Sequence, residues 1–134
     1  LNSARFLQKI QFNNNLIKNL TKILLFFQQK NQVSFVSTLK KMGKKNKNLL
    51  SFPEEGYTIT FDIKNNKNLK TFYMELEKIL IKMNAKIYLT KDILMTQDYF
   101  EKTYTNINKF IQFKKIYDPK FKFSSYQSKR LGIT

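Results

Sequence analysis

The chain has 134 residues, the length of one domain and enough to bury a hydrophobic core. It contains no cysteine and no histidine, which excludes disulfides, cysteine-based metal sites and the commonest general base and metal ligand. Lys and Arg number 25 against 9 acidic residues, and the net charge of +16 is typical of proteins that meet nucleic acid or an anionic membrane surface.

The kind of basic residue weakens that interpretation. Arginine occurs only at Arg5 and Arg130, and every other basic residue is lysine. Asn, Ile, Phe and Tyr are abundant too, and these residues share A/T-rich codons with lysine, so the base composition of the gene explains much of the charge. Because nucleic-acid surfaces favour arginine for its forked, stacking contacts, the charge alone does not identify a partner.

No segment predicts membrane insertion or secretion. The longest apolar run, residues 23–27, is far shorter than the roughly 20 residues of a membrane span. The first residues lack a signal-peptide pattern. We therefore expect a soluble domain, either cytoplasmic or peripheral to a membrane. Because the chain starts at Leu1 instead of methionine, we also expect it to be a piece of a longer protein.

The first half of the chain predicts a strand, a helix and a strand. Residues 6–12 alternate, with Ile10 and Phe12 on one face and Gln11 on the other. Apolar residues at helical spacing predict an amphipathic helix over 15–30. Residues 33–41 alternate again. The apolar face of this second strand is expected to hold Val33, Phe35 and Leu39, and its polar face Ser34, Thr38 and Lys40.

The second half follows the same order after a loop. Residues 43–48 predict the loop, and residues 51–56 predict a turn. The strand over 57–63 alternates most clearly, and an amphipathic helix over 67–84 follows it. The remaining predicted elements are a short fourth strand at 87–89, helices at 97–103 and 106–117, and a Pro- and Ser-containing tail from Asp118 to the end.

The order β-α-β-β-α-β is that of an α+β, ferredoxin-like fold: an antiparallel sheet with both helices on one face, here followed by C-terminal helices and a tail. The opposite face is then polar. Its expected members are Lys9, Gln11, Thr38, Lys40, Thr58 and Thr60. One interpretation is a sheet face left in water, which is common in antiparallel sheets. The other is a face that closes over a polar ligand, or over a cofactor held by another domain.

Five segments carry a resemblance to a known family. They are "SFVSTLKKMG" (34–43), "LSFPEEGYTITFDI" (50–63), "KIYLTKD" (86–92), "YDPKFKFSS" (117–125) and "KRLGI" (129–133). Together and in this order they resemble the C-terminal part of FAD-linked oxidases of the vanillyl-alcohol-oxidase type. Within that type the chain is most similar to decaprenylphosphoryl-ribose oxidases, and more distantly to sugar-1,4-lactone oxidases. The family's usual Gly-Trp-Asn reads Gly56-Tyr57-Thr58 here.

The resemblance implies the cap domain, on the substrate side, of a two-domain flavoenzyme. Residues 1–134 would form this single C-terminal domain, and an FAD-binding domain would lie N-terminal to Leu1. With only 3 glycines the chain has no Gly-rich loop for a pyrophosphate, so the isolated piece is expected neither to hold FAD nor to be active. The implied reaction is hydride transfer from a secondary alcohol of a sugar, free or lipid-linked, to the flavin.

Positions in the matching segments imply the site residues. Tyr88 and Lys91 correspond to a catalytic pair, and Lys91 also lies beside the flavin. The implied substrate-binding residues are Gln11, Thr38, Lys40, Thr58 and Thr60. No metal ligand is expected. Residues three apart on a regular strand point to opposite faces, so Tyr88 and Lys91 converge only if the strand ends near Leu89 and the chain turns. We expect replacement of Lys86, on the same strand, to leave flavin reduction almost unchanged, and we expect Asp92 to be structural.

A basic domain of this fold is alternatively an RNA-recognition module or a ribosomal protein. RNA-recognition modules stack bases on aromatic residues of the third strand, in a basic-Gly-aromatic-small-aromatic pattern. Here that strand reads "EGYTITF", with Glu55 in the basic position and Ile59 in the second stacking position. We therefore expect no specific nucleic-acid partner. Contact of the lysines with anionic lipid is a third interpretation, compatible with a lipid-linked sugar substrate.

Overall fold

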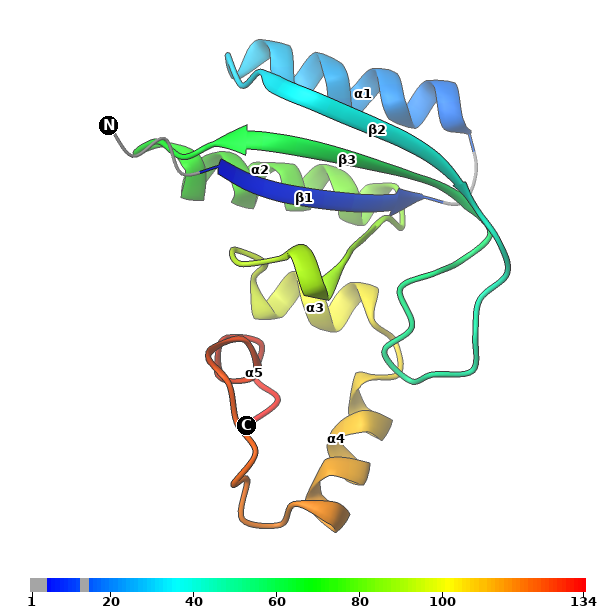
Figure 1. Ribbon diagram of the computed structural model, residues 1–134, viewed down its shortest axis with the longest axis vertical. Helices are drawn as coiled ribbons and strands as arrows, with labels where there is room; N and C mark the ends of the chain where they lie inside the picture. The colour runs from blue at the N-terminus through cyan, green and yellow to red at the C-terminus, as the bar shows by residue number, and fades with distance from the viewer. Residues whose placement is uncertain (1–4, 13–14) are drawn as a thin grey trace.

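The computed structural model describes residues 5–12 and 15–134. Its centre is an antiparallel sheet with the strand order β2-β3-β1-β4. The strands are β1 (Arg5–Phe12), β2 (Ser34–Met42), β3 (Gly56–Lys64) and β4 (Lys86–Ile87). Helix α1 (Leu16–Gln29) joins β1 to β2, and helix α2 (Leu69–Lys82) joins β3 to β4 (Figure 1). The predicted α+β, ferredoxin-like order is confirmed.

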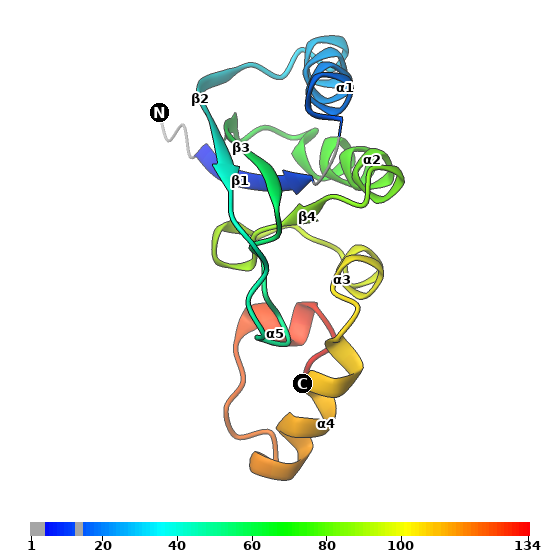
Figure 2. The ribbon, with the colours of Figure 1, turned by 90° about the vertical axis from the view of Figure 1, so that its right-hand side faces the viewer.

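Helices α1 and α2 lie on the same side of the sheet (Figure 2). Their contacts with the sheet and with each other are largely aromatic. Phe27 of α1 stacks on Phe61 of β3, with ring centroids 4.4 Å apart, and Phe26 stacks on Phe72 of α2 at 5.1 Å. All four side chains are buried. Burial of this apolar area, worth roughly 25 cal/mol per Å², holds the two layers together.

The beginning of β2 contains a β-bulge. Ser34 pairs with Ile63 and Ser37 pairs with Phe61, so β2 uses one residue more than β3 between these two pairs. The Ser34 hydroxyl closes the bulge, because its oxygen accepts a hydrogen bond from the amide of Asp62 at 2.9 Å.

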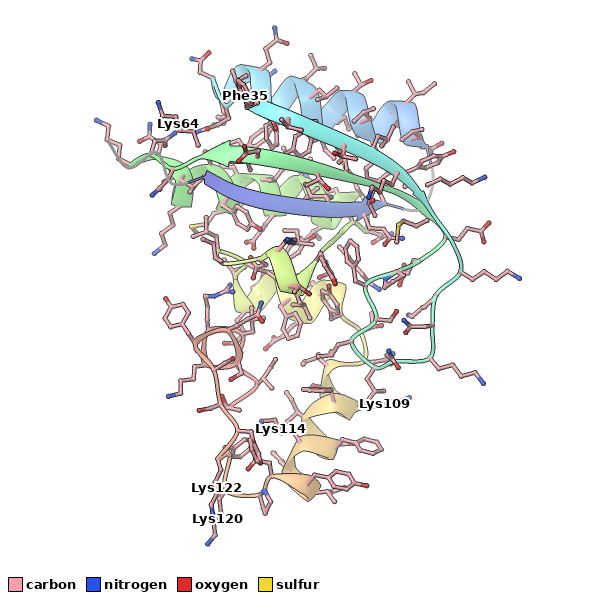
Figure 3. All side chains as sticks on the ribbon, in the orientation of Figure 1. Phe35, Lys64, Lys109, Lys114, Lys120 and Lys122 are labelled. Atoms are coloured by element: carbon pink, nitrogen blue, oxygen red, sulfur yellow. The ribbon has the colours of Figure 1, made fainter. Side chains whose placement is uncertain are left out.

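The bulge makes part of the predicted alternation wrong. Since side chains alternate with a period of two, one extra residue moves everything before it to the other face. Ser34, predicted on the polar face, pairs with the buried Ile63. Val33 and Phe35, predicted on the apolar face, are 80% and 78% exposed, and Phe35 is labelled in Figure 3. Beyond the bulge the predicted alternation holds.

The chain after α2 differs from the prediction in two places. The fourth strand is shorter and earlier than expected, and Leu89 belongs instead to a 3-10 turn, η1 (Leu89–Lys91). Helices α3 (Gln97–Thr103) and α4 (Ile107–Tyr117) match their predictions closely. Helix α5 (Tyr126–Arg130) lies in the predicted tail, and its five residues carry no apolar periodicity that would have predicted it.

Two buried tyrosines dock the segment of α3 against β4. The Tyr99 hydroxyl donates to the carbonyl of Ala85 at 2.6 Å, and the Tyr104 hydroxyl donates to the carbonyl of Ile87 at 2.7 Å. Burial raises the pKa of both hydroxyls, so they remain protonated donors. These bonds satisfy carbonyls beside a very short edge strand. In the described ranges, no helix has both the length and the apolar character needed to cross a membrane.

Replacing Phe27 by Ala should destabilise the domain by about 3–5 kcal/mol, because it removes a buried ring that contacts Phe61 and Phe72 and leaves a cavity. Phe35→Ala removes an equally large ring from an exposed position and should change the stability by less than about 0.5 kcal/mol. Urea unfolding of the purified chain measures both variants. Equal losses would show that the core is not where the structure places it.

Candidate functional site

One row of polar residues crosses the sheet on the face away from α1 and α2. Lys40 pairs with Thr58, and Thr58 pairs with Gln11. Gln11 pairs in turn with Lys86. Directly paired residues point to the same face, so each strand contributes one side chain to this row. The neighbouring row is apolar and belongs to the helix-covered face; it consists of Leu39, Ile59, Ile10 and Ile87.

A second row lies two residues further along the strands. Thr38 pairs with Thr60, and the backbone of Lys9 pairs with Thr60 from the other side. We call the residues of both rows whose side chains are described the polar face: Gln11, Thr38, Lys40, Thr58, Thr60 and Lys86. The structure thus brings together all five predicted substrate-binding residues. Thr38 and Lys40 are exposed and Thr60 is half-buried.

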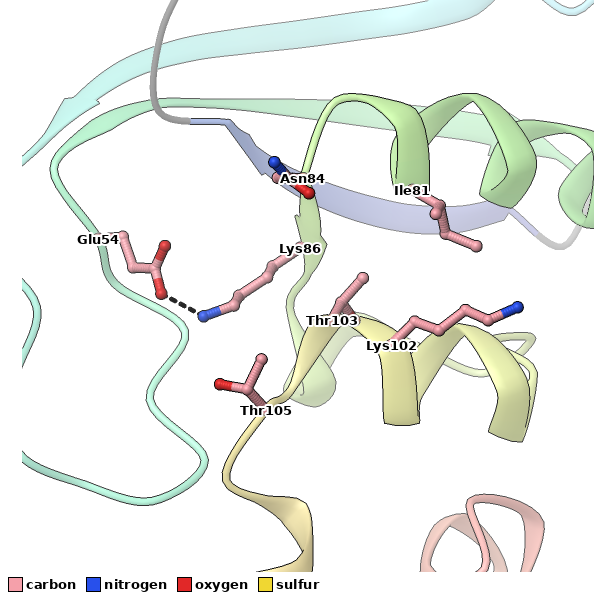
Figure 4. A pocket seen from close by; sticks show the side chains of 7 residues that line it. All are labelled: Glu54, Ile81, Asn84, Lys86, Lys102, Thr103 and Thr105. Atoms are coloured by element: carbon pink, nitrogen blue, oxygen red, sulfur yellow. Dashed lines mark hydrogen bonds and ion pairs between the residues drawn. The ribbon is translucent and has the colours of Figure 1, made fainter.

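The loop of residues 43–55 covers one end of the polar face. It extends from the ends of β2 and β3 in the direction of the C-terminal helices (Figures 1 and 2). Gln11 Nε2 donates to the main-chain oxygen of Glu54. The Glu54 carboxylate forms an ion pair with Lys86, drawn in Figure 4, and its Oε1 lies 3.4 Å from Lys45 Nζ. Gln11 and Thr58 are therefore only 1% and 0% exposed.

Lys86 makes contacts that the sequence did not indicate. Its side chain is 11% exposed, paired with Glu54, and its ammonium lies 5.6 Å from the ring centroid of Tyr104. Sequence reasoning missed it because the fourth strand was placed one residue too late. With the strand at Lys86–Ile87, pairing of Gln11 with Lys86 puts this lysine in the polar row.

Two neighbouring polar atoms beneath the loop have no hydrogen-bond partner among the described residues. They are Gln11 Oε1 and Thr58 Oγ1, and both are buried. Leaving a buried polar atom unpaired costs about 1–3 kcal/mol. A ligand hydroxyl that hydrogen-bonds to these two atoms would remove that cost, so they are candidate ligand-binding atoms. Gln11 and Thr58 are directly opposite each other in the register.

A cavity of about 230 Å³ lies beside the Glu54–Lys86 ion pair (Figure 4). Its other lining residues include Lys102, Thr103 and Thr105. None of the seven predicted site residues lines it. Lys102 is already paired with Asp98 at 2.8 Å. The cavity is therefore separate from the site that the sequence predicted.

The segment with Tyr88 and Lys91 turns as the sequence argument required. Strand β4 ends at Ile87, and the 3-10 turn η1 begins two residues later, at Leu89. Lys91 is exposed, and Tyr88 is half-buried. The Tyr88 ring packs on Phe52 of the loop, with centroids 4.7 Å apart. The covering loop therefore contacts both the polar row and the turn that carries the predicted catalytic pair.

The open face of β3 does not suit base stacking. Tyr57 and Ile59 alternate with Thr58 and lie on the helix-covered side, where Ile59 is buried and Tyr57 packs against the core. The open side of this strand presents Thr58 and Thr60, which have no ring to stack on a base. The open side of β3 therefore lacks the aromatic residues on which RNA-recognition modules stack bases. In the described part of the chain, no group of three or more acidic residues is arranged to hold a metal ion.

The fold and its polar face describe a two-layer α+β domain whose open sheet face carries hydroxyl, amide and ammonium groups. Residues 57–131, more than half of the chain, match the family model described as D-arabinono-1,4-lactone oxidase. The chain therefore belongs to the D-arabinono-1,4-lactone oxidase family. The matched stretch includes Thr58, Thr60, Tyr88 and Lys91.

The chain is also similar to a decaprenylphosphoryl-beta-D-ribose oxidase from Mycolicibacterium smegmatis. The two are 28% identical over 132 residues, which is 98% of this chain and 29% of the relative. The chain thus spans less than a third of the length of this relative. Together the two matches confirm the resemblance that the five sequence segments indicated.

Replacing Lys86 by Ala should destabilise the domain by about 2–3 kcal/mol, somewhat less than the loss of one partner from a fully buried ion pair, because it leaves the Glu54 carboxylate uncompensated. Lys70→Ala, at an exposed position on α2, should change the stability by less than about 0.5 kcal/mol. The double variant Glu54→Gln, Lys86→Met removes both charges and should recover most of the loss. The midpoints of urea unfolding measure the stability of each variant. If Lys86→Ala does not change the stability, the loop does not cover this end of the sheet.

Proposed function

We propose that this chain is the cap domain of an FAD-dependent oxidoreductase that oxidises a secondary alcohol of a sugar. The observation that carries the proposal is the polar row of Lys40, Thr58 and Gln11, on the sheet face opposite α1 and α2 in a member of this family. The greater length of the relative supports a further, FAD-binding domain, which we place N-terminal to residue 1. The chain alone is then one part of the enzyme.

The residues present fit a sugar and one edge of a flavin, not a whole FAD molecule. Gln11 Oε1 and Thr58 Oγ1 have no hydrogen-bond partner among the described residues and suit hydroxyl groups, and Lys91 is an exposed residue. A diphosphate would need backbone donors from a glycine-rich loop, which 3 scattered glycines do not form. When bound, FAD supplies the hydride acceptor. Lys91 is the residue of this chain that would contact it.

The accessible part of the polar face would orient the sugar. Lys40, Thr38 and Thr60 remain exposed or half-exposed and carry hydrogen-bond donors at neighbouring register positions. The Lys40 ammonium suits a hydroxyl or a phosphate, which agrees with the phosphoryl-sugar in the name of the relative. A lipid-linked sugar is thus the substrate class we propose, and the excess of lysine supports peripheral contact with anionic lipid.

Gln11 and Thr58 are not accessible to a substrate while the loop is closed. Both lie beneath the loop of residues 43–55, and Gln11 is held by the main chain of Glu54. They reach a substrate only when this loop moves away from the sheet. The loop would then exclude water again on closing, which strengthens the remaining polar contacts.

Lys91 would supply a fixed positive charge at the place where negative charge accumulates during the reaction. A preorganised ammonium is worth about 2–4 kcal/mol when it is aimed at a developing charge. Tyr88 stands before the same turn and is positioned by Phe52. We therefore assign Lys91 and Tyr88 the catalytic roles and the polar face the substrate-binding role.

In the full-length enzyme, Lys91→Ala should slow flavin reduction by at least about tenfold, through the loss of that charge. Anaerobic stopped-flow mixing with decaprenylphosphoryl-beta-D-ribose measures the rate. Lys70→Ala, another exposed lysine, is the matched control and should reduce flavin at the wild-type rate. If both variants behave like the wild type, Lys91 is a surface charge. If the wild type is not reduced at all, the proposed substrate is wrong.

The purified chain by itself should not bind FAD, because the contacts to the adenine and the diphosphate belong to the proposed second domain. Titration of the chain with FAD, followed by flavin fluorescence, tests this expectation. Saturable, tight binding would contradict the proposed division of the enzyme into two domains.

A further inference from the structure

The turn that carries Lys91 has little local structure of its own. The amide of Lys91 donates to the carbonyl of Tyr88 at 3.0 Å. The amide of Asp92 donates to the carbonyl of Leu89 at 3.3 Å. A single 3-10 turn is a weak element by itself. Contacts from other parts of the chain must therefore fix the position of the Lys91 backbone.

Asp92, directly after Lys91, provides the first of these contacts. Its side chain is fully buried. Oδ1 accepts hydrogen bonds from the amides of Leu94 at 2.9 Å and Met95 at 2.7 Å. Oδ2 accepts from Arg130 Nη2 at 2.7 Å. Asp92 thus points inward and closes the segment that follows Lys91, in agreement with the structural role expected for it.

Helix α5 holds the same segment at two further points. Gln127 Nε2 donates to the carbonyl of Leu89 at 2.6 Å, before Lys91 in the chain. Arg130 Nη1 donates to the carbonyl of Met95, after Lys91. Gln127 and Arg130 are three residues apart and share one face of the helix. Helix α5 therefore holds the turn on both sides of Lys91.

Helix α5 is itself fixed at both ends. Ser125 and Ser128 form a capping box, with distances of 3.0 Å and 2.8 Å. At the other end Leu131 is buried, and Gly132 adopts a φ of 70°, a left-handed conformation that ends a helix. The amide of Ile133 then donates back to the carbonyl of Ser128 at 2.8 Å. A five-residue helix anchored in this way can serve as a support.

An arginine suits position 130 better than a lysine. The planar guanidinium contacts Asp92 with one terminal nitrogen and Met95 with the other, which a single ammonium cannot reproduce with the same geometry. Arginine is rare in this lysine-rich chain. Without Arg130, the Asp92 carboxylate would be buried with no charged partner, and turning outward, toward Lys91, would relieve that cost.

We propose that Arg130 is a positioning residue for Lys91. Through Asp92 and Met95 it sets the conformation of residues 89–95, and thereby where the Lys91 ammonium stands relative to the flavin. This inference rests on the proposed function, in which Lys91 contacts the flavin. It gives the C-terminal helix a role in the reaction that is exerted through Lys91.

The test uses the full-length, FAD-loaded protein and two measurements. Hydrogen–deuterium exchange of the amides of Leu94 and Met95 reports the turn itself, independently of the flavin. An anaerobic dithionite titration gives the midpoint potential of the flavin, which a nearby ammonium raises by stabilising the reduced, anionic form. The variants are Arg130→Lys, Lys91→Ala and the double variant. Lys129→Ala, an exposed lysine on the same helix, is the control.

In Arg130→Lys, both amides should exchange about tenfold faster, because the turn opens locally while the rest of the domain stays folded. The midpoint potential should fall in the same direction as in Lys91→Ala. The double variant should have the potential of Lys91→Ala alone, since Arg130 acts through Lys91 and the two effects do not add. Lys129→Ala should change neither measurement.

Unchanged exchange in Arg130→Lys, or additive potential shifts in the double variant, would overturn the inference. If Lys91→Ala lowers the potential and Arg130→Lys does not, the positioning role alone is wrong. If Lys91→Ala has no effect on the potential, the proposed site is wrong and the inference falls with it. Should Arg130→Lys not fold, Gln127→Ala, which removes only the bond to Leu89, must show the same pattern at smaller amplitude.

Discussion

The register between β1 and β3 is the constraint on which the rest of the structure depends. It places Ile10 opposite Ile59 and Gln11 opposite Thr58. A slip of one residue would carry the isoleucines into solvent and the two polar side chains into the core, at a cost of several kcal/mol for unpaired polar groups. The same alignment that builds the core beneath α1 and α2 therefore also assembles the polar row. Core and candidate site cannot change independently of each other.

Glu54 divides the polar face into two parts. Its main-chain oxygen and its carboxylate hold Gln11 and Lys86 beneath the loop, while Thr38 and Lys40 stay open to solvent. An ion pair of this kind contributes little net stability compared with apolar packing, because the desolvation of both charges opposes their attraction. Its effect is on geometry: it fixes which part of the polar face lies beneath the loop and which part is open to solvent.

The turn of residues 88–92 shows how the position of a proposed catalytic residue can depend on distant parts of the chain. Two local hydrogen bonds would leave it poorly defined, and Gln127 and Arg130 supply the missing contacts from α5. Arginine is scarce here, and its use at this point follows from the need to reach a carboxylate and a carbonyl together. In a chain whose basic residues are almost all lysine, the arginine at position 130 thus indicates a specific structural requirement.

The sequence by itself determined the α+β order, the two covering helices, the family and the membership of Lys40, Thr58 and Gln11 in one face. These follow from periodicity and from short segments, which are local properties. The β-bulge at Ser34, the burial of Lys86 and the docking of α5 on the turn before Asp92 were decided only by the tertiary structure. Each depends on a contact between residues that are 20 or more positions apart in the sequence. The local alternation of polar and apolar residues does not predict such contacts.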